Sequence, residues 1–110
     1  MPYLNKSQAI KLAREKLIKS GCSEQNSLGI VDGILDAEFN GIKSHGFHYL
    51  PIYCNHLKIG KIKGDASPTF EKISRSSIKV DADNGFAHTA INIALNSLCE
   101  MSLNEGISCM

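Results

Sequence analysis

A histidine stands at the centre of the segment with the clearest potential for chemistry, residues 36–53, which read DAEFNGIKSHGFHYLPIY. An apolar helical pattern ends at Gly41, a Ser-His-Gly triplet follows at residues 44–46, and a second apolar pattern begins within a few residues. This arrangement predicts an imidazole at the junction of two helices, where solvent or substrate can reach it. Because histidine both accepts and donates protons near neutral pH, the position of His45 indicates acid–base chemistry.

Each residue of the triplet also has a purely structural interpretation, which the residues alone leave open. His45 can cap or pack a helix junction without touching a substrate. The hydroxyl of Ser44 can cap the helix that follows. Gly46 can serve only the geometry of the loop.

The whole chain has the composition of an ordinary globular domain. Its 110 residues are 43% hydrophobic and 21% charged, with a net charge of +1 and no stripe of lysine or arginine, so nucleic acid is not an expected partner. No apolar run approaches the roughly 20 residues that cross a bilayer, so we expect no membrane association. The N-terminus lacks the apolar core of a secretory signal, and we therefore expect a cytoplasmic protein.

The cysteines and histidines do not form a recognisable metal motif. The chain has four cysteines without a CxxC pair or a short ligand spacing, namely Cys22, Cys54, Cys99 and Cys109. Partly buried, reduced thiols are the favoured interpretation, and a disulfide framework is the alternative. His45, His48 and His56 lie near Cys54 in the sequence. Their spacing fixes no third ligand, so we predict no metal site.

Two helices with clear ends are predicted in the first 40 residues. Asn5, with Gln8 three residues later, resembles a capping box for a helix over residues 4–20. Ser23 is a plausible cap for a second helix that runs to about residue 40. The expected apolar faces consist of Ile10, Ala13 and Leu17 in the first helix and of Leu28, Val31, Ile34, Leu35 and Phe39 in the second.

Two glycines, Gly29 and Gly33, lie one turn apart inside the second predicted helix. Each costs about 1 kcal/mol of helix propensity relative to alanine. A close helix–helix contact would explain both glycines, and sequence drift is the alternative.

The remaining elements predict an α/β fold. A third helix is expected over residues 50–59, with Pro51 in its first turn. Strands are expected at residues 69–73 and 77–81, a turn at 83–85, a helix at 87–104 and the start of a further strand at 107–110. We thus expect one N-terminal region over residues 1–110, with a helical cluster (1–60) and the start of a mixed α/β part (61–110). Because a lone two-stranded ribbon is marginal and the last strand has no following partner, we expect a truncated chain.

The order of these motifs resembles the malate/L-lactate dehydrogenase family of the non-Rossmann type. That family includes ureidoglycolate and sulfolactate dehydrogenases and 2,3-diketogulonate reductase. Its pattern has a helix ending in an acidic-Leu-x-Gly motif, then Ser-His-Gly, and a Leu-Pro-x-Tyr helix ending at glycine. A Val-Asp-Gly-x-x-Gly turn, an alanine-rich helix and a Gly-Ile strand follow. This chain has matching elements in that order, including VDADNG at residues 80–85.

The resemblance implies part of a larger non-Rossmann NAD(P)-dependent dehydrogenase fold. Members transfer a hydride between NAD or NADP and a small 2-hydroxy or 2-keto acid, and a homodimer is expected for the full-length protein. His45 would be the general acid/base, Ser44 would orient it or bond a substrate oxygen, and Gly46 would allow close substrate approach. Most of the cofactor-binding part would lie beyond residue 110. The alternative is a truncated, non-enzymatic remnant or interaction domain.

Tyr49 is the main departure from the family pattern, which usually has arginine at this position. Arginine can hold a substrate carboxylate through two hydrogen bonds, whereas Tyr49 offers one hydroxyl and no charge. His48 could substitute for the arginine if protonated, and its alternative is an ordinary surface position. The acidic turn within residues 81–88 could lie near the cofactor or substrate, but a turn followed by a helix cap explains it without function.

Overall fold

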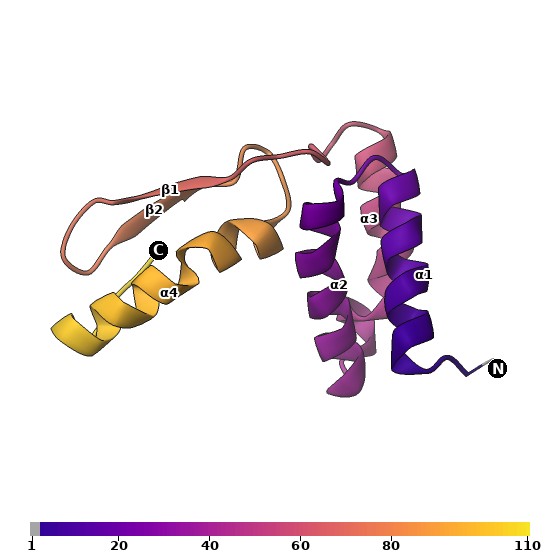
Figure 1. Cartoon of the computed structure of the whole chain (residues 1–110), viewed down its shortest axis with the longest axis horizontal. Coiled ribbons are helices and arrows are strands. Elements are labelled where there is room, and N and C mark those ends of the chain that lie inside the picture. Colours follow the sequence, from indigo (N-terminus) through magenta and orange to yellow (C-terminus); the bar gives the residue numbers. More distant parts are fainter. Residues whose placement is uncertain (1–2) are drawn as a thin grey trace.

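Three helices pack together at the N-terminal end, and a two-stranded sheet with a long helix extends from them (Figure 1). The computed structural model describes residues 3–110. The helical cluster consists of α1 (Lys6–Lys19), α2 (Glu24–Phe39) and α3 (Leu50–Lys58), with short 3-10 turns η1 (Lys43–His45) and η2 (Phe47–Tyr49) between α2 and α3. The second part consists of β1 (Thr69–Lys72), β2 (Ile78–Asp81) and α4 (Ala87–Glu105). The predicted order of helices and strands is therefore confirmed as far as α4.

The first two helices begin where local chemistry predicts. The Asn5 side chain accepts a hydrogen bond from the Gln8 N–H, and the Gln8 side chain accepts one from the Asn5 N–H, both at 2.9 Å. This pair is the predicted capping box. Ser23 Oγ accepts a hydrogen bond from the Asn26 N–H at 3.2 Å at the start of α2. Gly21, with φ of 105°, supplies the left-handed residue that follows α1.

The main core lies between α1, α2 and α3. Leu17, Ile30 and Ile34 are at most 1% exposed and form its centre. The predicted apolar face of α2 was partly wrong, because Leu28 is 49% and Phe39 is 68% exposed. The helix is apolar on more than one side, and the stripe that faces α1 and α3 is the one that contains Ile30.

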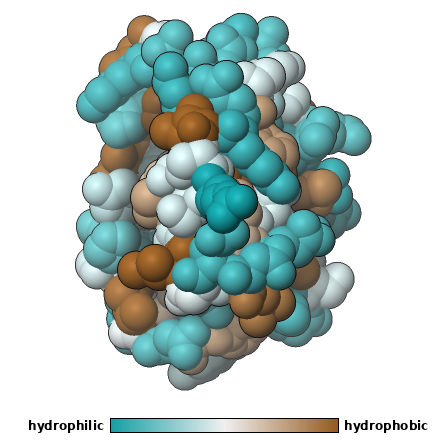
Figure 2. Space-filling model, turned by 90° about the vertical axis from the view of Figure 1, so that its left-hand side faces the viewer, coloured by the Kyte–Doolittle hydropathy of each residue, from teal (hydrophilic) through white to brown (hydrophobic). Residues whose placement is uncertain are grey.

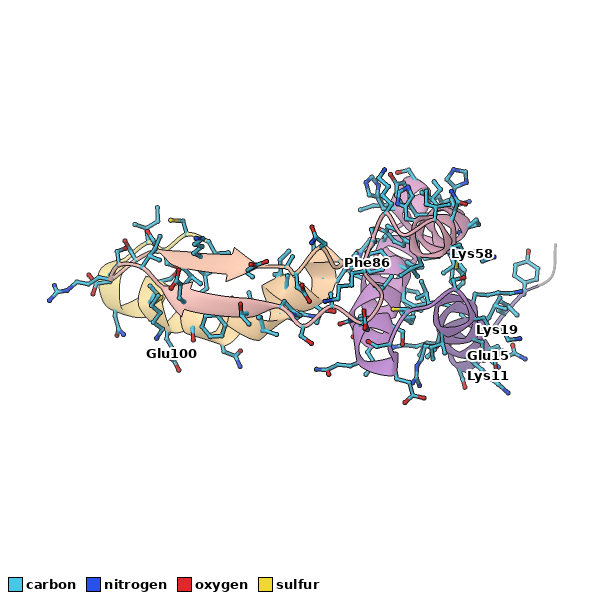
Figure 3. The ribbon with its side chains drawn as sticks, turned by 90° about the horizontal axis from the view of Figure 1, so that it is seen from above. Lys11, Glu15, Lys19, Lys58, Phe86 and Glu100 are labelled. Carbon is cyan, nitrogen blue, oxygen red and sulfur yellow. The ribbon has the colours of Figure 1, made fainter. Side chains whose placement is uncertain are left out.

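Phe86 joins the second part of the molecule to this core. Its side chain belongs to the core cluster of the three helices, although it directly precedes α4 in the sequence. Figure 3 shows Phe86 at the place where the two parts meet. Its side chain therefore fixes the beginning of α4 against the helical cluster.

The glycines of α2 permit a close contact with α4. A Cβ atom added at Gly33 would lie 2.7 Å from His88 Cδ2, and one at Gly29 would lie 3.4 Å from His88 Cβ. The imidazole of His88 thus lies directly against the backbone of α2. This geometry confirms the helix–helix contact as the explanation of Gly33, whereas a Cβ atom at Gly29 would make only an ordinary van der Waals contact and the contact does not require glycine there.

The two strands form an antiparallel hairpin that is covered by α4. Phe70 lies opposite Val80 in the register, and a small core forms from Ile78, Ala94 and Met101. The predicted C-terminal strand is reduced to a single bridge. Cys109 N–H donates a hydrogen bond to Ser76 O at 2.8 Å, and Cys109 O accepts one from the Ile78 N–H at 2.9 Å. Residues 76–78 thus pair with the C-terminal segment, for which no partner was expected.

The surface at the far end of the hairpin is mixed in character. Figure 2 views this end and shows brown, hydrophobic patches that lie between hydrophilic side chains. In the part of the chain that the structure describes, no helix has the length and apolarity to span a bilayer.

The four cysteines are free and differ in environment. Cys22 is buried and Cys54 is half-buried, as predicted, but Cys99 and Cys109 are exposed. Burial, with a smaller contribution from Cys54, raises the pKa of the Cys22 thiol to about 11. Cys22 is therefore a protonated core residue near neutral pH. Among residues 3–110, no cluster of three or more histidine, cysteine or acidic side chains is arranged to hold a metal ion.

Candidate functional site

The Ser-His-Gly triplet lies in the connection between α2 and α3. Ser44 and His45 fall in η1, Gly46 separates the two 3-10 turns, and Tyr49 ends η2. The side chains of Ser44 and His45 are exposed. The imidazole is therefore attached to a tightly turned backbone and remains reachable from solvent.

Ser44 contacts the imidazole directly. Its Oγ lies 3.0 Å from His45 Nδ1, and the ring tautomer decides which atom donates. With Nδ1 occupied, Nε2 is the ring nitrogen left to exchange a proton with a substrate. The alternative in which Ser44 caps the next helix was wrong, because α3 begins at Leu50 with Tyr49 at its N-cap position.

Glu38, which the sequence did not single out, holds the loop in place. Its carboxylate accepts a hydrogen bond from the Phe47 N–H at 3.0 Å. A Cβ atom at Gly46 would overlap this carboxylate and would lie 3.1 Å from Glu38 Cδ. The close approach of Glu38 therefore explains why position 46 is a glycine. The expected contact of Gly46 with substrate stays a prediction. The sequence could have pointed to Glu38, because this residue occupies the acidic position of the acidic-Leu-x-Gly motif.

Tyr49 is the second predicted site residue that contacts His45. The two rings are stacked, with centroids 5.7 Å apart and an interplanar angle of 6°. Tyr53, one turn later on α3, meets Tyr49 edge to face at 5.1 Å. His48 is exposed and is not part of this arrangement. The structure thus brings Ser44, His45 and Tyr49 together and leaves His48 at the surface beside them.

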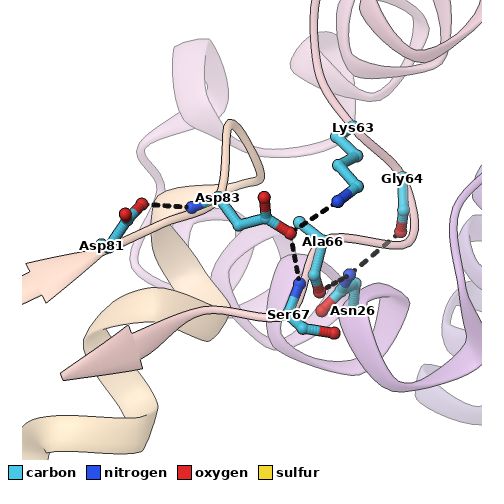
Figure 4. Close-up of polar contacts among 7 residues, drawn as sticks. All are labelled: Asn26, Lys63, Gly64, Ala66, Ser67, Asp81 and Asp83. Atoms are coloured by element: carbon cyan, nitrogen blue, oxygen red, sulfur yellow. Dashed lines mark hydrogen bonds and ion pairs between the residues drawn. The ribbon is translucent and has the colours of Figure 1, made fainter.

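The acidic turn after β2 has a structural role. Asp83 Oδ2 accepts hydrogen bonds from Lys63 Nζ at 2.7 Å and from the Ser67 N–H at 3.0 Å (Figure 4). The hydrogen bond from Lys63, followed by that from Ser67, lowers the pKa of the Asp83 carboxyl below its usual value. The interpretation as a turn is confirmed, but its second half was wrong, because the N-cap residue Phe86 makes no side-chain capping bond to α4.

Asn26 ties the same connection to α2. Its Nδ2 atom donates hydrogen bonds to Gly64 O and Ala66 O, both at 3.0 Å (Figure 4). Asn26 is 5% exposed. The connection between α3 and β1 is therefore held from one side by α2 and from the other by Asp83. These contacts place the start of α4, and with it Phe86, relative to the helical cluster.

His88 is a half-buried titratable group that packs against α2. Burial lowers the pKa of its imidazole. Within the described part of the chain, the buried Nδ1 atom has no hydrogen-bond partner. The ring borders a hollow that is also lined by Gly29, Gly33, Asp32 and Asp36 of α2. His88 is thus kept neutral at a packed helix contact.

We expect acidification to destabilise the protein through His88. The folded state binds a proton at this residue less readily than the unfolded chain, whose histidine pKa is about 6.5. The resulting stability is complete above that pH and is lost as the pH falls towards the lower folded value. Melting temperatures recorded from about pH 7.5 to about pH 5 should fall less steeply in His88→Gln than in the wild type. His48→Gln, at an exposed position, is the control, and an unchanged slope in His88→Gln would contradict the assignment.

Comparison with known proteins places the chain among dehydrogenases and reductases. The family model for malate/L-lactate dehydrogenase matches residues 4–110. L-sulfolactate dehydrogenase of Methanothermobacter thermautotrophicus is 27% identical over 94% of this chain and 30% of the relative. Delta(1)-pyrroline-2-carboxylate reductase 1 of Burkholderia ambifaria is 32% identical over 90% of this chain and 29% of the relative.

A solved structure agrees with these sequence relatives. The crystal structure of delta1-piperideine-2-carboxylate reductase from Pseudomonas syringae pv. tomato matches with a TM-score of 0.89 and 28% identity. The match covers 96% of this chain and 32% of that structure. The chain thus spans about 30% of the length of the curated relatives that it matches.

Proposed function

Because the chain belongs to the malate/L-lactate dehydrogenase family, we propose that it carries the proton-transferring part of an NAD(P)-dependent oxidoreductase. The substrate is a small 2-hydroxy acid or the corresponding 2-keto acid, and the full-length protein acts as a homodimer. The observation that carries the proposal is the exposed His45 imidazole, whose Nδ1 lies 3.0 Å from Ser44 Oγ on a loop held by Glu38. This arrangement leaves Nε2 free to act on a substrate oxygen.

In the proposed oxidation, His45 Nε2 accepts the proton of the 2-hydroxyl group. NAD or NADP, when bound, supplies the acceptor for the hydride that leaves C2. In the reverse direction His45 returns the proton to the carbonyl oxygen. Ser44 keeps the imidazole turned so that Nε2, and not Nδ1, faces the substrate. Proton transfer by a positioned side chain of this kind typically contributes about 10²- to 10⁴-fold to the rate.

No contact among residues 3–110 identifies a site for NAD or NADP. The Rossmann fold uses a glycine-rich turn between a strand and a helix to approach the pyrophosphate, but the family resembled here is of the non-Rossmann type. Within residues 3–110, the turn between β2 and α4 is occupied by the contacts of Asp83 with Lys63 and Ser67. We therefore assign no residue of this chain to NAD or NADP.

The substrate end of the proposed site involves Tyr49, His48 and Gly46. Tyr49 brings one phenolic hydroxyl to the side of His45 and no permanent charge. His48 is exposed one residue earlier and is the nearest group that could carry a positive charge. Gly46 contributes through the loop geometry that it shares with Glu38. A carboxylate bound here would thus be held by hydrogen bonds more than by a fixed ion pair.

A substrate panel tests the proposed function. The protein at its natural length is mixed with NADH or NADPH and, in turn, with several 2-keto acids and with delta(1)-pyrroline-2-carboxylate, which the name of the Burkholderia ambifaria relative suggests. We expect oxidation of the nicotinamide with at least one 2-keto acid, followed by its absorbance. If the protein reduces only the cyclic imine, its substrate is a cyclic imino acid and not a 2-keto acid. A folded protein that turns over none of these compounds would contradict the proposal and favour a non-enzymatic relative.

A further inference from the structure

A column of aromatic rings leads from His45 into the core. We call His45, Tyr49, Tyr53 and Phe86 the aromatic column. Successive ring centroids lie 5.7, 5.1 and 5.2 Å apart, and the first pair is parallel whereas the next two meet edge to face. Both kinds of contact are favoured arrangements of aromatic rings. The exposed imidazole is thus the outer end of a continuous set of contacts.

The imidazole needs such a contact to keep one orientation. His45 is exposed, and among residues 3–110 its imidazole has one hydrogen-bond partner, the neighbouring Ser44. One hydrogen bond from an adjacent residue leaves the ring free to tilt about it. The ring of Tyr49, which lies parallel to the imidazole with an interplanar angle of 6°, prevents this tilting.

Tyr49 is itself held from behind. Its ring lies against Tyr53, which is half-buried on α3. Tyr53 contacts Phe86, which is 6% exposed at the start of α4, and also lies 6.1 Å from the His88 ring. Figure 3 shows Phe86 at the meeting point of the two parts. The position of Tyr49 therefore depends on the packing of both the helical cluster and α4.

We propose that Tyr49 is a positioning residue: its ring, supported by Tyr53, sets the His45 imidazole for proton exchange. This inference rests on the proposed function and explains what a tyrosine does where the family pattern has arginine. The aromatic face is the part of Tyr49 that matters for the imidazole, and the hydroxyl is not required for it.

Two substitutions separate the ring of Tyr49 from its hydroxyl. Tyr49→Phe keeps the ring but lacks the hydroxyl proposed for the substrate carboxylate, so it should raise KM and retain kcat within about threefold. Tyr49→Leu removes the aromatic face as well and should lower kcat by about 10- to 100-fold. KM should rise by a similar factor in both variants, because both lack the hydroxyl, whereas kcat should fall only where the ring that orients the base is lost. The melting temperature is recorded for both variants. An equal loss of kcat in Tyr49→Phe and Tyr49→Leu would overturn the proposal, because the loss would then come from the hydroxyl and not from the ring.

Proton NMR of the His45 ring gives a readout that does not depend on turnover. The ring signals are assigned by their loss in His45→Gln, and stacking on Tyr49 should shift them relative to those of an exposed histidine. The shift should persist in Tyr49→Phe and disappear in Tyr49→Leu. Identical signals in wild type and Tyr49→Leu would overturn the proposal, whatever the activity. An inactive wild type with the shift present would instead contradict the proposed function, while the shift would still confirm the stacking contact.

Discussion

Replacing His45 by glutamine is expected to lower kcat of the natural-length protein by about 10²- to 10⁴-fold, with a small effect on KM. Glutamine keeps a polar side chain on the loop but cannot accept and release a proton near neutral pH. Ser44 and Glu38 would still shape the connection, since the Glu38 carboxylate contacts the backbone at Phe47 and not the imidazole. The rate is followed by nicotinamide absorbance with the best substrate of the panel.

His56→Gln is the matched control for this experiment. His56 lies on α3, outside the loop of the triplet, and takes no part in the stacking that involves His45. We expect it to retain wild-type kcat. If His45→Gln is as active as His56→Gln, the imidazole of His45 does not take part in the reaction.

Gly64→Ala is expected to cause a large loss of stability, because Gly64 is packed directly against backbone atoms. A Cβ atom there would overlap the Gly21 carbonyl oxygen, and it would lie 2.7 Å from Gly21 C and 3.1 Å from Cys22 Cα. These are backbone atoms, so they cannot move aside as a flexible side chain can. Gly64 O also accepts hydrogen bonds from the Ser23 N–H at 2.9 Å and from Asn26 Nδ2 at 3.0 Å. Any shift that relieves the overlap stretches both bonds.

We therefore expect Gly64→Ala to cost about 3 kcal/mol or more, from overpacking and weakened hydrogen bonds together. Urea unfolding of the natural-length protein measures this cost as a lower transition midpoint. Gly29→Ala is the control, because a Cβ atom there meets its nearest neighbour, His88 Cβ, at 3.4 Å. Alanine also favours a helix interior by about 1 kcal/mol over glycine, so this variant should be neutral or more stable. Equal midpoints for Gly64→Ala and wild type would contradict this expectation, because the connection between α3 and β1 would then accommodate the added methyl group at little cost.

The ends of the elements could be predicted from sequence because they depend on local chemistry. The capping box of Asn5 and Gln8 and the cap of Ser23 involve atoms that are three residues apart. Any helix that begins there makes the same bonds, whatever lies around it. The buried face of α2 could not be predicted equally well. Its sequence is apolar on more than one side, and only the packing of α1 and α3 decides that Ile30 is buried and Leu28 is not.

The candidate site was predicted residue by residue but not as an arrangement. The triplet pointed to His45, and the contact with Ser44 followed from adjacency. The hydrogen bond from Phe47 N–H to Glu38 joins residues nine positions apart, on a helix and on a loop, and no periodicity predicts it. For Tyr49 the sequence indicated a substrate-binding position with one hydroxyl in place of the arginine charge, but not a ring contact. Its stacking on His45 depends on the turns of η1 and η2, which the sequence did not predict.

Transfer of an isotope from substrate to cofactor is the measurement that bears most directly on the proposed chemistry. The natural-length protein is given oxidised NAD or NADP and the 2-hydroxy acid selected by the panel, labelled with deuterium at C2. We expect mass spectrometry to find the deuterium in the reduced nicotinamide, with its rate of appearance at least about 100-fold lower in His45→Gln. A wild type that forms no deuterated cofactor, or a His45→Gln variant that forms it at the wild-type rate, would contradict the proposed role of this chain.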